Sequence, residues 1–134
     1  LAAAASTSSP PNATAIEQLV QINIFYAEKF AQLLDRLDSI PEGDGQTMLD
    51  HTLVVWVNEL GRGNSHSLTD IPFILAGNVL GADGTPRFRM GRHVHYDGEQ
   101  PHNDLLTSIC QAFGMSTTHF GDMRFSNGPL ARLT

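Results

Sequence analysis

Cysteine, basic side chains and long apolar runs are all scarce in this sequence. The single cysteine, Cys110, excludes an internal disulfide framework and a zinc site built from several cysteines. Eight Lys and Arg stand against fourteen Asp and Glu, for a formal net charge of −6, so we expect no nucleic-acid partner. No apolar run reaches the length of about 18 residues that a membrane-spanning helix needs, so we expect no membrane span.

Signatures of a catalytic nucleophile or of a nucleotide loop are absent as well. The sequence contains no Gly-x-Ser-x-Gly elbow, no Gly-x-x-x-x-Gly-Lys-Ser/Thr loop and no Gly-x-Gly-x-x-Gly after an apolar run. If the chain takes part in catalysis, the identity of its catalytic residues is unknown, and we expect the nucleophile to lie outside this chain.

What the chain does have is an ordinary globular composition, with 41% hydrophobic and 16% charged residues. Its length is that of one domain. The first residues are Ala, Ser, Thr and Pro, so we expect a flexible segment over residues 1–13 and a single domain over residues 14–134.

Two amphipathic helices are predicted. Apolar residues recur at spacings of three and four over residues 14–40, with Thr14 and Glu17 as a possible capping box and Pro41 as the terminator. A second helix is predicted over residues 103–113, with Gly114 in the C-terminal cap position.

Two strands are predicted between these helices. Residues 52–57 form an uninterrupted β-branched and aromatic run, typical of a strand buried on both faces in a parallel sheet. Residues 71–76 are the second strand, and residues 60–70 are expected to be a loop. The order helix, strand, strand, helix predicts part of an α/β layer structure whose remaining strands lie elsewhere.

Residues suited to chemistry crowd after the first predicted strand. Ligands bind beyond the carboxyl ends of strands in open α/β sheets, where Asn58 and Glu59 lie, and His66 follows seven residues later. A carboxylate and an imidazole are both ligands for a divalent ion. The alternatives are a solvated Glu59, or a Glu59 paired with Arg62, and a hydrogen-bonded loop histidine at position 66.

Other histidines give weaker patterns. His93 and His95 are two residues apart, so they share one face if the segment is a strand, where they are either metal ligands or edge residues. His102 precedes the second helix and is interpreted as a helix cap, with Asn103 or the preceding loop as the alternatives for that role.

Several stretches resemble one bacterial family. They match the C-terminal part of an uncharacterised, mostly exported family named for a His-x-x-Ser-His-His motif and related to the alkaline phosphatase and sulfatase superfamily. The matching stretches are residues 35–45, 48–61, 64–67, 70–77, 91–93, 102–106 and 120–122.

The resemblance implies a fold and a partner. The chain is then the C-terminal segment of an alkaline-phosphatase-like α/β/α sandwich with a long N-terminal amphipathic helix. In the superfamily the nucleophile and the first metal-binding aspartate lie in the N-terminal half, so that missing half is the implied partner. Export to the periplasm or the extracellular space is implied by the family alone.

The resemblance also assigns roles to the loop residues. The superfamily has a strand ending in Asp-His, then a metal-binding histidine shortly before a Val-Pro or Ile-Pro strand. Glu59 and Leu60 stand in place of Asp-His, and His66 stands five residues before Ile71. By resemblance His66 and Glu59 are metal ligands for zinc, calcium or magnesium, and Asn58 and Arg62 contact a substrate oxyanion.

The resemblance implies one function, and two departures from the superfamily pattern leave a second one open. The first is a metal-dependent hydrolase-like protein acting on phosphate or sulfate esters, in which the ion stabilises charge on oxygen. The second is a non-catalytic binding or assembly module that keeps the scaffold, since Leu60 cannot ligate a metal and no nucleophile is present.

Overall fold

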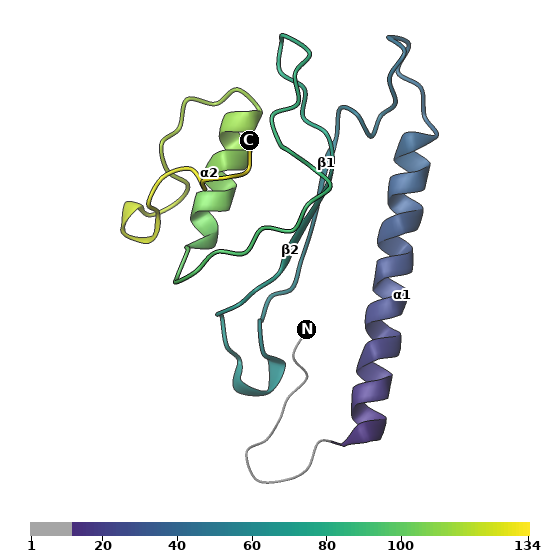
Figure 1. Cartoon of the computed structure of the whole chain (residues 1–134), viewed down its shortest axis with the longest axis vertical. Coiled ribbons are helices and arrows are strands. Elements are labelled where there is room, and N and C mark those ends of the chain that lie inside the picture. Colours follow the sequence, from purple (N-terminus) through teal and green to yellow (C-terminus); the bar gives the residue numbers. More distant parts are fainter. Residues whose placement is uncertain (1–11) are drawn as a thin grey trace. The chain divides into compact units, whose positions relative to one another are not determined.

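The computed structural model describes residues 12–134 of the chain (Figure 1). Helix, strand, strand and helix follow one another as predicted, together with two short 3-10 turns. The elements are α1 (Ala13–Asp38), β1 (Leu53–Val57), η1 (Gly63–Ser65), β2 (Phe73–Gly77), α2 (His102–Ala112) and η2 (Met123–Phe125). Most of the predicted flexible segment, residues 1–11, lies outside the described residues. Among those described, no helix combines the length and the apolarity that crossing a membrane requires.

The chain divides into two compact units. The described part of unit 1 comprises residues 12–48 and 54–76 and holds α1 with most of the β1–β2 hairpin. Unit 2 comprises Leu49–Leu53 and Gly77–Thr134 and holds α2 with the segments around it. The described residues therefore have a mixed α/β structure. The larger α/β/α sandwich that the resemblance implies stays a prediction.

The start of α1 is set by Asn12. Its side-chain oxygen accepts a hydrogen bond from the backbone N–H of Ala15 at 3.2 Å, which satisfies one of the free donors of the first turn. Thr14 lies inside the first turn, so the prediction that Thr14 caps the helix was wrong. At the other end the Ser39 N–H donates to Asp35 O at 3.0 Å, two residues before Pro41.

The two strands pair as an antiparallel hairpin. The predicted parallel sheet was therefore wrong. Parallel strands need a long crossover, usually a helix, whereas residues 58–72 between these strands contain only the short turn η1. An uninterrupted apolar strand was misleading because hairpin strands can also carry apolar side chains on both faces.

One face of β1 packs on α1, within unit 1. The rings of Trp56 and Phe30 have centroids 5.4 Å apart and are inclined by 41°. Side chains alternate along a strand, so Val55 and Val57 point to the opposite face, and they are 38% and 43% exposed. Burial of both faces, as the sequence predicted, is thus not found within the described residues.

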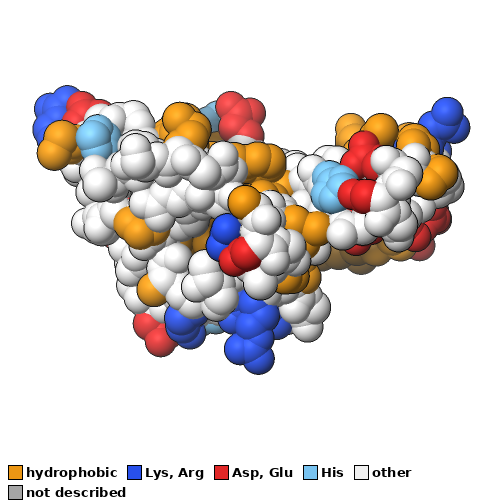
Figure 2. Space-filling model, turned by 90° about the horizontal axis from the view of Figure 1, so that it is seen from above, with side chains coloured by type: hydrophobic (Ala, Val, Ile, Leu, Met, Phe, Trp, Pro, Cys, Tyr) orange, Lys and Arg blue, Asp and Glu red, His pale blue; other side chains and the backbone are white. Residues whose placement is uncertain are grey.

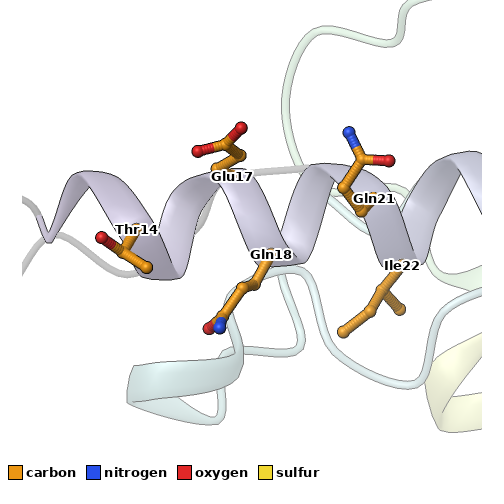
Figure 3. A pocket seen from close by; sticks show the side chains of 5 residues that line it. All are labelled: Thr14, Glu17, Gln18, Gln21 and Ile22. Carbon is orange, nitrogen blue, oxygen red and sulfur yellow. The ribbon is translucent and has the colours of Figure 1, made fainter.

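Unit 1 leaves much apolar surface exposed. None of its described residues is fully buried. Along α1, large hydrophobic side chains are exposed on several sides of the helix. The space-filling view also shows hydrophobic side chains at the molecular surface (Figure 2). A hollow of about 530 Å³ lies against the first turns of α1 and is lined by this helix alone (Figure 3). The exposed large hydrophobic residues of α1 are Ile16, Leu19, Val20, Ile22, Ile24, Phe25, Tyr26 and Leu33.

Unit 2 contains the buried hydrophobic side chains of the described structure, which are Val79, Phe88 and Leu105. Its helix α2 ends as predicted. Gly114 has a φ of 83° and its N–H donates to Gln111 O at 2.9 Å, while the next N–H, of Met115, donates to Cys110 O at 3.1 Å. These paired bonds form a Schellman motif, which needs the left-handed backbone that glycine adopts without strain.

The start of α2 differs from its prediction. Pro101 occupies the N-cap position without a side-chain hydrogen bond, and His102 is the first helical residue. The prediction that His102 caps the helix was therefore wrong. Proline suits the N-cap position because a backbone N–H at the start of a helix has no partner within the helix, so its absence in proline costs no helical hydrogen bond.

The chain end is tied to the segment that precedes α2. The Tyr96 hydroxyl donates to Ala131 O at 2.5 Å, and the Arg132 guanidinium donates to His95 O and lies 4.7 Å from the centre of the Tyr96 ring. No strand forms over residues 92–96, so the shared strand face considered for His93 and His95 is absent.

Candidate functional site

The predicted site residues lie on the loop that joins β1 to β2. Beyond the strands the two arms of the hairpin stay paired. Gly61 N–H donates to Ser67 O at 2.9 Å, Ser67 N–H donates to Arg62 O at 3.1 Å, and Arg62 and Ser67 form an antiparallel bridge. The loop is therefore an ordered extension of the hairpin, and Arg62 and His66 stand at its tip.

His66 closes a four-residue turn. The turn consists of Gly63, Asn64, Ser65 and His66, and the His66 N–H donates to Gly63 O at 3.4 Å. His66 has φ 50° and ψ 36°, in the left-handed region that ends many four-residue hairpin turns. The bridge directly after it fixes the direction in which the chain leaves this histidine.

Gly61 allows the returning arm to approach closely. A Cβ atom at this position would stand 1.8 Å from Thr69 O, so only glycine fits. On the returning arm the Ser67 and Thr69 hydroxyl oxygens lie 2.8 Å apart, and the Thr69 N–H donates to Ser67 Oγ at 3.2 Å. Side-chain hydroxyls thus add hydrogen bonds along the returning arm.

The four candidate side chains are accessible. Glu59, Arg62 and His66 are exposed and Asn58 is half-buried. Within the described part of the chain these four side chains make no hydrogen bond or ion pair with one another. The ion pair between Glu59 and Arg62, considered above as an alternative, is therefore not present. The hairpin brings the four residues onto one loop and leaves their polar atoms available.

The loop by itself does not complete a metal site. Catalytic zinc sites take about three protein ligands and structural ones about four. Across residues 12–134 no group of three or more His, Cys, Asp or Glu side chains could hold a metal ion. Glu59 and His66 are suitable donors, but two donors fall short of a full ligand set.

A second polar cluster lies in unit 2, at the start of α2. Asp104 and Thr107 are 2% and 0% exposed, and Ser108 is also buried. The Thr107 hydroxyl donates to Asn103 O at 2.8 Å, and the Ser108 hydroxyl donates to Asp104 O at 2.9 Å. Because these groups already have partners, the cluster is structural. Sequence reasoning missed Asp104, although an acidic residue directly before the apolar pair Leu105 and Leu106 was a usable signal.

The perturbed carboxylates lie outside the hairpin. Hydrogen bonds from the Thr85 side chain and backbone, with the nearby Arg87 charge, lower the pKa of Asp83. Hydrogen bonds from the Arg124 side chain and backbone lower the pKa of Asp122. Both carboxylates are at the surface, and each stabilises a local turn of unit 2.

A hollow of about 670 Å³ lies in unit 2. Phe88, Met90 and Arg89 line it, with Asn78, whose side-chain oxygen is buried and has no hydrogen-bond partner in the described structure. It contains none of the residues that the sequence singled out as a site.

Comparison with known proteins gave no relative: no family model, no curated protein and no solved structure matches the chain.

Proposed function

We propose that the chain is the C-terminal segment of an exported, metal-dependent hydrolase-like protein of the phosphatase and sulfatase superfamily. The observation that carries this proposal is the ordered β1–β2 loop, which holds His66, Arg62 and Glu59 exposed and without side-chain partners in the described structure. A side chain that must bind a ligand needs both a fixed backbone and free polar atoms. The hairpin supplies both.

Each candidate has a role that suits its chemistry. His66 is the proposed metal ligand, since neutral imidazole is a common ligand of zinc. Glu59 is a second ligand, or a carboxylate that orients one. Arg62 is suited to the tetrahedral oxyanion of a phosphate or sulfate ester, because a guanidinium can donate two parallel hydrogen bonds. The Asn58 amide is a second donor toward the same oxyanion.

The remaining ligands would have to come from outside the described residues. Two donors on one loop are too few to hold an ion as a catalytic site does. The proposal therefore includes a partner, the N-terminal half of the same fold, which would supply the nucleophile and further ligands.

Exposed apolar surface supports such a partner. From Ile16 to Tyr26 large hydrophobic residues of α1 are exposed, whereas the apolar face of an amphipathic helix normally packs against a core. The face of β1 with Val55 and Val57 is also exposed, and a two-stranded sheet alone is marginally stable. Additional strands and helices of an α/β/α sandwich would cover both surfaces.

Leu60 favours a second candidate function. It is a half-buried aliphatic residue at the place where the resembled superfamily has a metal-binding histidine. A protein that kept the scaffold but lost this ligand would serve as a non-catalytic binding or assembly module. Such a module would bind no divalent ion and would hydrolyse no phosphate or sulfate ester.

Metal analysis of the parent protein distinguishes the two. The longer protein that contains this segment is purified and its bound zinc, calcium and magnesium are measured, alongside hydrolysis of 4-nitrophenyl phosphate and 4-nitrophenyl sulfate. Stoichiometric metal and metal-dependent turnover support the hydrolase. Absence of both supports the non-catalytic module.

A further inference from the structure

The chain end of unit 2 is held against α2 by a buried carboxylate. Asp104 Oδ1 accepts hydrogen bonds from Ser126 Oγ at 3.0 Å and from the Asn127 N–H at 2.7 Å. Further on, the Leu130 N–H donates to Asp104 O at 3.1 Å and to Ser108 Oγ at 2.7 Å. We call these contacts the tail clamp. They require a fixed main-chain length between residues 127 and 130.

An asparagine followed by glycine lies inside this clamp. Asn127 is the one asparagine of the sequence that precedes a glycine. It is exposed, and its side-chain amide makes no hydrogen bond within the described structure. The Gly128 N–H has only a long contact of 3.4 Å with Ser126 Oγ, beyond the usual range for a strong hydrogen bond.

The surroundings of Gly128 leave its amide nitrogen open to react. Gly128 has a φ of 106°, a conformation that glycine adopts at little cost, and a Cβ atom there would meet only Thr118 O at 3.9 Å. The space beside the Gly128 Cα is therefore open, which leaves the backbone there room to move toward the neighbouring Asn127 side chain.

We propose that Asn127–Gly128 is a site of spontaneous deamidation that releases the tail clamp. The Gly128 nitrogen attacks Cγ of Asn127, so that an N–Cγ bond forms, the Cγ–Nδ2 bond breaks and ammonia leaves. Water then opens the cyclic imide at either carbonyl, giving aspartate or isoaspartate at position 127. Overall one water is consumed and one ammonia is released, and no oxidant, reductant or enzyme is required.

Both products oppose the clamp. Aspartate at position 127 places a second carboxylate beside the buried carboxylate of Asp104, and like charges at short range repel. Isoaspartate also adds a methylene to the main chain, which displaces the Leu130 N–H from Asp104 O and Ser108 Oγ. The segment from Ser126 to Thr134 should then open locally more often, and its amide hydrogens should exchange faster.

Peptide mapping by mass spectrometry tests the chemistry. The folded chain is incubated at mildly alkaline pH, and conversion of every asparagine to acid is followed over time. Asn127 should convert ahead of Asn64, which is exposed at the hairpin tip and precedes serine. Asn127→Gln is the matched control and should remove the leading product. Conversion at Asn64 with Asn127 intact would overturn the proposal.

Hydrogen exchange tests the structural consequence. Aged wild-type protein should exchange the Leu130 amide faster than fresh protein, and Asn127→Asp should reproduce part of this change. Asn127→Gln, aged in the same way, should keep the slow exchange. Because aged wild-type protein is measured directly, the test stands even if Asn127→Asp does not fold. Unchanged exchange at Leu130 in fully deamidated protein would disprove release of the clamp.

Discussion

The backbone oxygen of Thr69 occupies the space in which any side chain at Gly61 would begin. A Cβ atom at Gly61 would stand 1.8 Å from it, closer than two such atoms can approach. The absence of a side chain at Gly61 lets the two arms of the β1–β2 loop approach closely, and Arg62 and His66 lie at the tip beyond it.

Gly61→Ala should therefore destabilise the hairpin. Forcing an extra methyl group into a packed site costs about 1–3 kcal/mol, because the backbone must move. Urea denaturation should show a loss of about 2 kcal/mol in the free energy of unfolding. Gly63→Ala is the matched control, since a Cβ atom there meets nothing within 4 Å. Equal effects of the two substitutions would contradict the assigned contact.

The contact between Phe30 and Trp56 should account for much of the stability of unit 1. Fully buried aromatic residues cost about 3–5 kcal/mol when replaced by alanine, and a half-buried one costs less. Phe30→Ala should thus lower the free energy of unfolding by about 2 kcal/mol, with a loss of the near-ultraviolet circular dichroism of Trp56. Leu68, which is 72% exposed, is the control: Leu68→Ala should change stability by at most about 0.5 kcal/mol.

The buried carboxylate of Asp104 should be needed for an ordered chain end. Asp104→Ala removes the acceptor for Ser126 Oγ and the Asn127 N–H, and a lost charged hydrogen bond with an unsatisfied donor costs about 3 kcal/mol. Asp97, fully exposed and paired only with His95 at 3.7 Å, provides the comparison. If Asp97→Ala and Asp104→Ala gave the same change in thermal unfolding, the clamp would have no energetic role.

Acid should weaken the turn at Asp122. The Arg124 hydrogen bonds hold the pKa of Asp122 below its ordinary value of 3.8. A carboxylate with a lowered folded pKa stabilises the folded state above pH 3.8, and this contribution is lost as the pH falls through the folded pKa. Wild type should thus exceed Asp122→Asn in stability near neutral pH, and the difference should shrink well below 3.8. A difference independent of pH would show that the charge does not matter.

Much of the fold was predictable because its signals are local. The apolar spacing over residues 14–40 predicted α1 almost to its ends, and Gly114 marked the end of α2 by the left-handed conformation of its backbone. Each of these signals acts within one or two helical turns. Local sequence was therefore sufficient for them.

The wrong predictions concern two kinds of choice: which of two residues caps a helix, and which strand pairs with which and in what direction. Asn12 and Thr14 can each cap a helix, and the choice depends on where the helical backbone begins. It begins at Ala13, so the Asn12 side-chain oxygen accepts from the Ala15 N–H. An apolar strand such as β1 suits a parallel or an antiparallel neighbour equally, so the pairing was misassigned. The tail clamp joins Asp104 to residues more than twenty positions away, a distance over which no periodic pattern gives a signal.

The sequence placed the candidate residues on a loop after β1, where the structure has them, but their roles stay predictions. Polar residues after β1 were expected to lie together, and they do share one ordered loop. Whether they bind a metal depends on ligands that no described residue supplies. Resemblance to a superfamily suggested the roles, and they stay predictions.

Metal stoichiometry of the parent protein with and without the His66 imidazole tests the central claim most directly. We predict that the intact protein binds a divalent ion in a fixed ratio and that His66→Ala lowers the bound metal at least tenfold, as expected for loss of a direct ligand. Asn64→Ala, at the same hairpin tip, should retain it. Unchanged metal content in His66→Ala would remove this histidine from the site and contradict the account.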